Sequence, residues 1–394
     1  MAMMMLNMSR RSALLGLSSA FTVGRTSLAL ADAPGQKRLV VVLLRGALDG
    51  MAAVVPYGDA DLVRLRDGLV PPGPGQTDGM LDLGGFYGLH PALAGVYGMF
   101  KEGNALLVHA VAGPYRSRSH FEAQDYMESG AEERLSSGWL NRAVTAILGR
   151  RANEALAVGV TVPLLLRGPA TVGSYAPTSY GALSPDLYAR IAMLSEHDPV
   201  LGPAIAEGLR DRGFTKETLS GTDLAKAGDM ASVAAAAGRL LAAPDGPRVA
   251  AMELGGWDTH AGQAQRLVGP LKQLDAGLVA LKGALGAAWK DTAVLVMTEF
   301  GRTARVNGTR GTDHGTASVA FVLGGAVAGG RVAGTWPGLS DSKLFENRDL
   351  APTTDVRALA MGLLVSHMGV PEAAMGAVFP GSGSVSREAG LLRV

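Results

Sequence analysis

The sequence predicts an α/β fold with a mostly parallel central sheet between helices. Several short apolar runs are continuous rather than alternating, as in strands that are buried on both faces. Segments with helical periodicity lie between these runs, and such alternation is typical of layered α/β proteins. The 394 residues, 47% of them hydrophobic, suffice for one large domain or two ordinary ones with a sizeable core.

Six apolar runs are expected to form buried parallel strands. They span Leu39–Leu44, Ala105–Val111, Ala157–Leu166, Val249–Leu254, Ala293–Thr298 and Val319–Leu323. Aromatic residues make up only 5% of the chain, so we expect a core of Val, Leu, Ala and Met.

The clearest helix is expected between Ala261 and Trp289. Pro270 should kink this helix near its start or mark its first turn. Its leucines alternate between spacings of four and three residues, which places on one face Leu267, Leu271, Leu274, Leu278, Leu281 and Leu285.

Further helices are expected from Ser119 and from near Thr354. Residues 171–245 are rich in Ala, Ser and Gly, and we interpret them as a mostly helical insertion over the sheet. The insertion would belong to a single α/β domain of residues 37–390.

The N-terminal segment resembles an export signal. Paired Arg10 and Arg11 precede a weakly apolar run, and small residues that suit a signal peptidase follow near residue 33. Arg25, late in the segment, favours the twin-arginine route. An ordinary secretory signal or a short uncleaved anchor is the alternative. We therefore expect residues 1–33 to direct export to the periplasm, with the twin-arginine translocase as a partner.

Composition excludes several classes of function. The chain has no cysteine, which rules out disulfides, thiolate metal sites, a cysteine nucleophile and a formylglycine derived from cysteine. Its formal charge is +1; removing residues 1–33 takes away three arginines and one aspartate, which leaves −1. Such a balance gives no electrostatic case for nucleic acid. After the export segment, no apolar run is long enough to span a membrane.

Chemically active side chains gather where predicted strands end. Ligands of open α/β sheets bind beyond the carboxyl ends of the strands, so this clustering indicates a site. The residues that follow four strands or precede the last one are Arg45, Asp49, Arg116, Arg118, Ser119, His120, Asp258, His260, Glu299, Arg302, Asp313 and His314.

Each carboxylate or histidine in this set also has a structural interpretation. Asp49 before a glycine could shape a turn, and Asp258 could cap a helix. Asp258 and His260 could instead place two ligands on one metal ion. Glu299, which closes a buried strand, needs a partner, and Arg302 or Arg45 could form an ion pair with it.

The same holds for the remaining candidates. Asp313 and His314 could lie in an ordinary loop, although Gly and Thr neighbours let the backbone approach a site closely. Ser119 and Glu122 fit the capping-box pattern. Ser119 could also be a nucleophile at a helix N-terminus that favours anions. His120 could be a ligand, a base or a surface residue. His90, His109, His197 and His367 lack companions, and we interpret them as structural.

These motifs carry a family resemblance. The segments "LLRGALDGMAAVVPYGD", "SRSHFEAQDYMESG", "GWLNRAV", "GGWDTHAGQ", "TEFGRT", "GTDHGTASVAFVLGG" and "APTTDVRALAMGLL" resemble the exported bacterial family catalogued as domain of unknown function 1501. That family is similar to the alkaline phosphatase, sulfatase and phosphoglycerate mutase superfamily. The resemblance implies a mixed, mostly parallel sheet and a site with two metal ions held by Asp, Glu and His. It also implies a nucleophile that attacks phosphorus or sulfur.

The order of the site residues matches this superfamily. An aspartate after the first strand, a nucleophile at a helix start, an Asp with a His, an acidic residue after a strand and a late histidine correspond to Asp49, Ser119, Asp258, His260, Glu299 and His314. The sequence also departs from the pattern. Asp258 and His260 are more closely spaced, and Glu299–Phe300 stands where the superfamily has Asp-His, so one nitrogen ligand is missing. Asp313–His314 could replace it, or His314 alone could be the late histidine.

The resulting hypothesis is an exported hydrolase of phosphate or sulfate esters. One or two divalent ions (zinc, manganese, magnesium or calcium) would be held by Asp49, Asp258, His260, Glu299, Asp313 and His314. Ser119, Arg302 and His120 would be catalytic, and Arg45, Arg116 and Arg118 would bind a small anionic ester.

Two alternatives remain. One is a non-catalytic envelope protein that keeps the scaffold and binds a ligand or partner, which the missing nitrogen ligand favours. The other is an exported redox protein, which is weaker because no Gly-x-Gly-x-x-Gly follows the first strand and no cysteine can hold iron–sulfur.

Overall fold

A computed structural model describes residues 36–147, 154–176 and 229–393, together with residues 193, 198, 214–215 and 217–219. Residues 1–33, His197 and most of the expected insertion lie outside these ranges. In the described part of the chain, no helix combines the length and apolarity that crossing a membrane requires.

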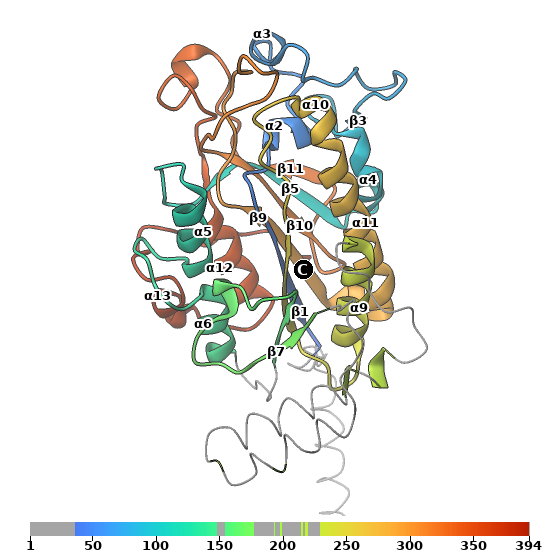
Figure 1. Cartoon of the computed structure of the whole chain (residues 1–394), viewed down its shortest axis with the longest axis vertical. Coiled ribbons are helices and arrows are strands. Elements are labelled where there is room, and N and C mark those ends of the chain that lie inside the picture. Colours follow the sequence, from blue (N-terminus) through green and yellow to red (C-terminus); the bar gives the residue numbers. More distant parts are fainter. Residues whose placement is uncertain are drawn as a thin grey trace, which may run out of the picture.

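A mostly parallel sheet forms the centre of the molecule (Figure 1). In the part that the structure describes, its strand order is β11-β5-β10-β9-β1-β8-β6-β7, with β12 also paired to β5. The strands are β1 (Arg38–Leu44), β5 (Ala105–Ala112), β6 (Ala155–Val158), β7 (Val172–Tyr175), β8 (Val249–Leu254), β9 (Thr292–Thr298), β10 (Ser318–Leu323), β11 (Arg331–Ala333) and β12 (Thr354–Asp355). A small separate sheet contains β2 (Val54–Val55), β4 (Gly88–Leu89) and β3 (Leu81–Asp82).

Helices cover both faces of the sheet (Figure 1). One layer contains α4 (Ala94–Lys101), α9 (Met230–Ala242), α10 (Gln263–Arg266) and α11 (Val268–Leu285). The other contains α5 (His120–Ser129), α6 (Trp139–Ala146), α12 (Val356–Ser366) and α13 (Met375–Val378). Two short helices, α2 (Gly50–Ala53) and α3 (Leu62–Arg66), lie at one end. The expected fold class, an α/β sheet between helices, is confirmed.

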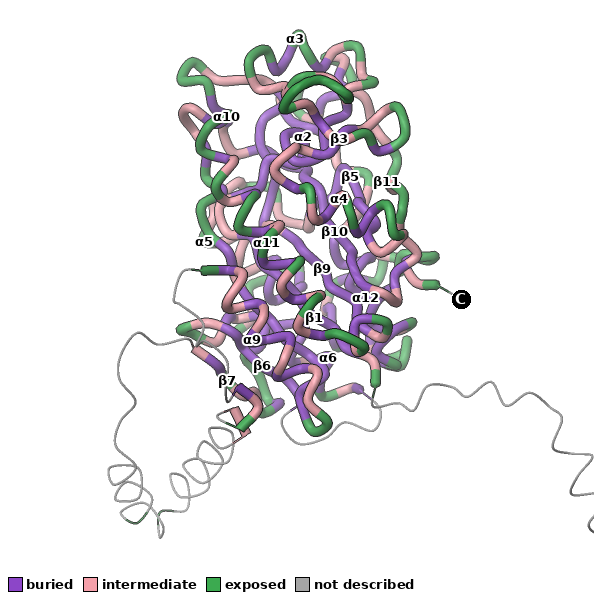
Figure 2. The backbone as a smooth tube through the Cα atoms, turned by 90° about the vertical axis from the view of Figure 1, so that its right-hand side faces the viewer, coloured by how far each residue is buried: buried purple, intermediate pink, exposed green. Residues whose placement is uncertain are grey.

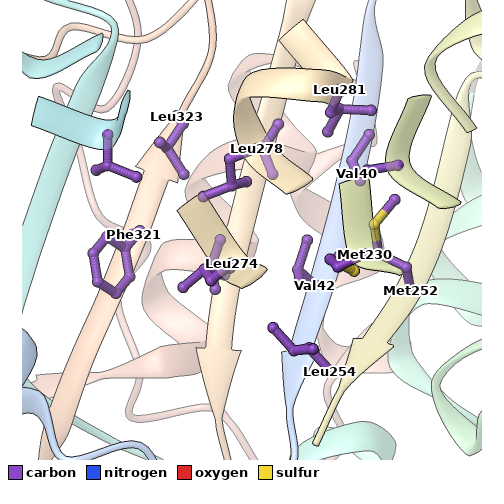
Figure 3. Close-up of a cluster of buried hydrophobic side chains, with 14 of the residues drawn as sticks. Val40, Val42, Met230, Met252, Leu254, Leu274, Leu278, Leu281, Phe321 and Leu323 are labelled. Atoms are coloured by element: carbon purple, nitrogen blue, oxygen red, sulfur yellow. The ribbon is translucent and has the colours of Figure 1, made fainter. Parts of the chain in front are cut away.

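The two faces of β1 explain why its sequence is apolar throughout. Val40 and Val42 point into a core that includes the leucines of α11 (Figure 3), whereas Leu39 and Val41 point into the core under α6 and α12. Figure 2 shows the resulting buried strands inside a more exposed shell. A strand buried on both faces cannot alternate polar and apolar residues, so the expectation from the continuous runs holds.

Three segments differ from the expectations. The segment Ala157–Leu166 contains only the last two residues of β6, which ends at Val158, and then a 3₁₀ turn at Leu164–Leu166 that follows Pro163. The long helix after Ala261 divides into α10, α11 and a 3₁₀ segment, and Pro270 lies in the first turn of α11. β7 is a strand at the start of the segment that was expected to be mostly helical.

A further correction concerns β10. We expected a parallel strand, but β10 pairs antiparallel with both β5 and β9. The start of β10 therefore lies at the edge where the parallel strands β1, β8 and β9 end. This reversal brings the residues before β10 to the same edge as the residues that follow the other strands.

Candidate metal centre

Four chain segments meet at the carboxyl edge of the sheet. His120 begins α5 after the loop that follows β5, and Asp258 and His260 lie in the loop after β8. Glu299 immediately follows β9, and His314 precedes β10. Residues separated by up to 194 positions in the sequence are therefore neighbours in space.

Three imidazoles surround one carboxylate oxygen. The Nε2 atoms of His260, His314 and His120 lie 3.0, 3.5 and 3.6 Å from Oδ1 of Asp258. We call these four residues the histidine–aspartate group. One ligand atom each from His120, Asp258 and His314 lies within 4.8 Å of the others, a spacing that can hold a metal ion.

Each histidine of the group is anchored through its other ring nitrogen. Nδ1 of His120 is 2.8 Å from Glu299, Nδ1 of His260 is 3.0 Å from Asp313, and Nδ1 of His314 is 2.9 Å from the carbonyl oxygen of Arg118. All three partners are acceptors, so each Nδ1 carries the proton in the neutral ring. The three Nε2 atoms then present lone pairs toward Asp258, which is how histidines are oriented around metal ions.

Two observations favour a cation between these lone pairs. Nε2 of His260 and Nε2 of His314 are 3.0 Å apart, although neither has a proton to donate when Nδ1 is protonated. Within the described chain, Nε2 of His120 is buried and has no hydrogen-bond partner. A buried nitrogen without a partner is costly, and a bound metal ion would satisfy all three atoms.

The separations suit a small divalent ion. Nitrogen ligands about 2.0–2.1 Å from tetrahedral zinc lie roughly 3.3 Å from each other. The distances from Oδ1 of Asp258 to the three Nε2 atoms, and from Nε2 of His260 to Nε2 of His314, are 3.0–3.6 Å and bracket that value. The cluster whose ligand atoms all lie within 4.8 Å of one another consists of His120, Asp258 and His314, without His260. Three nitrogens and one oxygen favour zinc or a similar borderline ion over calcium, which prefers oxygen ligands.

Aromatic packing fixes two of the rings. Phe300 stacks on His120 with a centroid separation of 4.9 Å and lies 5.2 Å from the ring of His314. Phe300 follows Glu299 directly, so one short segment after β9 supplies both the carboxylate and the apolar support for His120.

Glu299 holds His120 and does not belong to the histidine–aspartate group. Its carboxylate accepts hydrogen bonds from the backbone N–H of Gly46, from His120, from Gln124 and from Thr298. Burial alone would raise the pKa of Glu299, but these hydrogen bonds outweigh it and lower the pKa. The sequence suggested Arg302 or Arg45 as its partner or a direct metal contact; the structure gives it His120 as its partner.

Asp313 holds His260 through a hydrogen bond to Nδ1, as Glu299 holds His120. Its carboxylate also accepts a hydrogen bond from Asn307 at 3.0 Å, and the hydrogen bond to His260 is the main cause of its lowered pKa. Asp313 therefore orients a ligand, as Glu299 does. The expected Asp313–His314 pair divides into two roles, because His314 belongs to the histidine–aspartate group itself.

The surroundings shift the pKa values of two histidines in opposite directions. The hydrogen bond to Glu299 raises the pKa of His120 above 6.5. Burial lowers the pKa of His314, which favours its neutral, metal-binding form. In Asp258, burial tends to raise the pKa, but the hydrogen bond and charge of Arg302 lower it overall, so the carboxylate stays ionised.

Asp49 lies outside the histidine–aspartate group, contrary to the sequence-based ligand set. Its carboxylate accepts hydrogen bonds from the first turn of α2, from Gln263 and from Arg66, whose Nη1 is 2.6 Å away. Both side chains of this ion pair are only 1% exposed. The carboxylate of Asp49 is therefore enclosed by α2, Gln263 and Arg66, and none of the histidines of the group is among its described hydrogen-bond or ion-pair partners.

The arginines that we expected to bind substrate have other partners. Arg45 contacts Glu253, Glu128 and Gln124. Arg118 pairs with Glu346 and Asp349, and its φ of 62° belongs to the left-handed region; its carbonyl oxygen holds His314. Arg116 is exposed and bonds only to the backbone carbonyls of residues 113 and 115 among the described contacts. Arg302 is buried and contacts Asp258.

Ser119 precedes α5 without capping it. No hydrogen bond links its side chain to the first turn, and Glu122 bonds to the hydroxyl of Tyr115 instead of closing a capping box. The structural interpretation of Ser119 therefore does not hold. Among the described hydrogen bonds, none involves its hydroxyl, which lies at the start of the helix one residue before His120.

Some functional positions were not found from the sequence. His120 was expected to be catalytic, with a ligand role left open, yet it supplies the third imidazole of the group. Gln124 and Phe300 support Glu299 and His120 and were not considered. The spacing of four residues between His120 and Gln124, on one helix face, is the signal that could have indicated Gln124.

The other described histidines have structural positions. His109 bonds to the carbonyl of Val54, His367 bonds to the carbonyl of Arg38, and His90 accepts from the N–H of Ala92. Burial lowers the pKa of each to about 4, so they are neutral. His197 lies outside the described residues.

Comparison with known families identifies one match. A model of the family described as "Protein of unknown function (DUF1501)" matches residues 107–379. No curated protein matches the chain significantly.

Comparison with solved structures gives matches with TM-scores of 0.33–0.40. The crystal structure of Ps i-CgsB in complex with k-i-k-neocarrahexaose has 8% identity and a TM-score of 0.40, over 89% of this chain and 77% of that one. Alkaline phosphatase from the Antarctic bacterium TAB5 has 13% identity and a TM-score of 0.35, over 73% and 91%. Phosphonate monoester hydrolase of Agrobacterium radiobacter has 11% identity and a TM-score of 0.33, over 75% and 70%.

Proposed function

The chain belongs to the DUF1501 family of proteins of unknown function, and we propose that it is an exported, metal-dependent hydrolase of phosphate or sulfate esters. The supporting observation is the convergence of three anchored histidines on Oδ1 of Asp258. Such convergence, with every Nδ1 already bound to an acceptor, favours a metal ligand set over a structural cluster.

The metal would be held by His120, His260, His314 and Asp258. A divalent ion there would supply Lewis acidity toward the oxygens of an ester. Because Asp49 is buried against Arg66 and has none of the three histidines among its described partners, we propose one ion per chain rather than two. Asp258 and His260 have side chains 48% and 44% exposed, so a substrate can reach the group from solvent.

Ser119 is the proposed nucleophile. Its hydroxyl has no cap hydrogen bond, it adjoins the ligand His120, and it lies at the N-terminus of a ten-residue helix. Helix N-termini stabilise anions, so this position suits a phosphate or sulfate group. Attack by the Ser119 oxygen would form a bond to phosphorus or sulfur and break the bond to the ester oxygen, which would leave as the alcohol after taking up the serine proton. Water would then hydrolyse the seryl ester, releasing phosphate or sulfate and restoring the Ser119 hydroxyl.

Phe121 supports an apolar leaving group. Its side chain is 85% exposed although it follows His120 directly in the first turn of α5. A large exposed aromatic side chain beside a polar cluster offers contact area to a substrate. Aryl esters are therefore the appropriate probes.

The proposal that the protein is exported is supported by the sequence alone. Residues 1–33 carry the paired arginines Arg10 and Arg11 and lie outside the described residues. The proposal predicts that Arg10→Lys combined with Arg11→Lys leaves the protein inside the cell. Periplasmic protein in the double variant would contradict twin-arginine export.

A non-catalytic, metal-binding envelope protein is the second candidate. One observation favours it. Arg45, Arg118 and Arg302 all form ion pairs with acidic side chains, so these three guanidinium groups are not available to hold an anionic ester. The sequence argument for this alternative, a missing nitrogen ligand, is weaker now that His120 supplies one.

Turnover separates the two candidates. Zinc-, manganese- and magnesium-loaded protein would be assayed with 4-nitrophenyl phosphate and 4-nitrophenyl sulfate, beside Ser119→Ala and His314→Ala. The hydrolase proposal predicts metal-dependent turnover that both variants abolish, while Ser119→Ala keeps its metal. Metal-loaded wild type that hydrolyses neither ester supports the binding protein. Unchanged turnover in Ser119→Ala would show that Ser119 is not the nucleophile.

A further inference from the structure

Arg302 makes an unusually complete set of contacts for a buried arginine. Nε donates to the carbonyl of Ala47 at 2.9 Å, and Nη1 donates to the carbonyl of Thr312 at 3.2 Å. Nη2 donates to the carbonyls of Gly46 and Trp257 and to Oδ1 of Asp258. The side chain is fully buried, so these five acceptors replace water around the charge.

The acceptors come from different segments of the edge. Gly46 and Ala47 follow β1, Trp257 and Asp258 follow β8, and Thr312 precedes β10. Arg302 lies in the same connection between β9 and β10 as Thr312, so one guanidinium links three loops. These loops carry five of the residues that form or anchor the histidine–aspartate group: Asp258, His260, Glu299, Asp313 and His314.

The fixed loop geometry also reaches His120. The N–H of Gly46 donates to Glu299, and Glu299 holds Nδ1 of His120. Gly46 has a φ of 116°, and a Cβ added there would lie 2.8 Å from the backbone nitrogen of Asp258. The loop after β1 therefore packs directly against the loop that carries Asp258, and Arg302 bonds to both.

Among the described residues, the only side-chain acceptor of Arg302 is Oδ1 of Asp258, the atom on which the three histidines converge. We propose that Arg302 is a positioning residue that assembles the histidine–aspartate group before metal binding and thereby sets its metal affinity. In this role Arg302 acts through Asp258, whereas the sequence suggested that Arg302 itself is catalytic. The metal part of this inference rests on the proposed function.

Arg66 provides a matched control. It is also buried, it pairs with a carboxylate at 2.6 Å, and it donates to two backbone carbonyls, those of Thr303 and Ala304. It has no contact with any residue of the histidine–aspartate group among the hydrogen bonds that the structure describes. Lysine at either position keeps a positive charge but cannot reproduce the planar fork of donors.

The test compares Arg302→Lys and Arg66→Lys in the full mature chain. Zinc affinity would be measured by chelator competition well below the unfolding temperature of each variant. Arg302→Lys should weaken zinc binding about 10- to 100-fold, the range found when support for metal ligands is removed. Arg66→Lys should keep the zinc Kd within about threefold, although it lowers Tm. Wild-type affinity in Arg302→Lys, or an equal loss in Arg66→Lys, would overturn the inference.

A metal-independent readout separates failure of this inference from failure of the proposed function. Without metal, hydrogen exchange in Arg302→Lys should accelerate at the amides of residues 46–48, 258–260 and 311–314, and Arg66→Lys should leave these amides protected. A wild-type protein that binds no metal would refute the metal centre. The hydrogen-exchange pattern would still test whether Arg302 positions the loops. Unchanged protection in Arg302→Lys would refute the positioning role.

A wild-type measurement decides the matter if Arg302→Lys does not fold. The guanidinium Nε–H resonance of Arg302 should shift when zinc is added, because Arg302 and the ion share Asp258, whereas that of Arg66 should not. If the wild type binds no zinc, the spectrum of the Asp258→Asn variant is compared with that of the wild type instead. The Arg302 resonance should then differ between the two proteins, and the Arg66 resonance should be the same. Absence of a selective Arg302 shift in the applicable experiment would overturn the inference.

Discussion

Nε2 of His260 and Nε2 of His314 face each other at 3.0 Å, while Nδ1 of each ring already has an acceptor. Neutral rings held in this way have two lone pairs directed at each other. A cation between them, or protonation of one ring, relieves the repulsion. A cation bound between the two Nε2 atoms would therefore be stabilised.

Glu299→Gln should weaken metal binding. The amide cannot provide the negative charge that orients and raises the basicity of His120, so we expect a loss of about 10- to 100-fold in zinc affinity. Glu253→Gln is the control, since Glu253 pairs with Arg45 and has no contact with the histidines among the described interactions. Equal zinc affinity of both variants in a chelator competition would contradict the role of Glu299.

Metal binding should strengthen as pH rises through the pKa of His120. Glu299 raises that pKa above 6.5, so protons compete with the ion to a higher pH than at an ordinary histidine. In Glu299→Gln the midpoint of the pH dependence should move down. NMR titration of His120 in metal-free protein measures it, and an identical midpoint in the two proteins would refute the assignment.

The same shift predicts the opposite trend for the stability of metal-free protein. A raised folded-state pKa adds stability that is fully present below the unfolded pKa of about 6.5 and is lost as pH rises through the folded pKa. The contribution of Glu299 to Tm, measured as wild type minus Glu299→Gln, should therefore shrink on going from pH 6 to pH 8. A contribution that grows with pH would contradict this account.

Asp49→Asn should destabilise the fold without altering metal content. Removing one partner of a buried ion pair leaves Arg66 uncompensated, at a cost of about 3–5 kcal/mol in the free energy of unfolding. Denaturant titration measures this loss, and elemental analysis of the folded variant measures the metal. Loss of the metal from folded Asp49→Asn would restore Asp49 as a ligand.

Ser119→Ala should hardly change stability. A serine that caps a helix contributes about 1 kcal/mol, but the hydroxyl of Ser119 makes no cap hydrogen bond. We expect a change in the free energy of unfolding of less than about 0.5 kcal/mol, with Asp229→Ala as the contrasting case because Asp229 caps α9. A loss of about 1 kcal/mol or more in Ser119→Ala would indicate that it caps α5 in solution.

The sequence was sufficient for the strands and for the edge at which they end. Runs such as Val249–Leu254 are apolar because both faces are buried, and that requirement is visible locally. Strand direction is not visible in this way. The antiparallel pairing of β10 depends on the path of the chain between β9 and β10, yet it is this direction that brings His314 to the site.

Ligand roles were harder to predict because they depend on which side chains surround a carboxylate or an imidazole in the folded protein. Asp49 and Asp258 both follow buried strands and both pair with an arginine, but only Asp258 is surrounded by histidines. Glu299 and His120 are 179 positions apart, and no local pattern indicates that they pair. The residue types at the site were predictable, whereas the division between ligands and their supports required the structure.

The most direct test is the metal content of the purified mature protein, measured by elemental analysis beside His314→Ala and a His90→Asn control, which changes a histidine outside the group. The account predicts about one equivalent of a divalent metal such as zinc per chain in wild type and in His90→Asn, and a large loss in His314→Ala. A folded wild-type protein that neither contains nor takes up a divalent metal would contradict it.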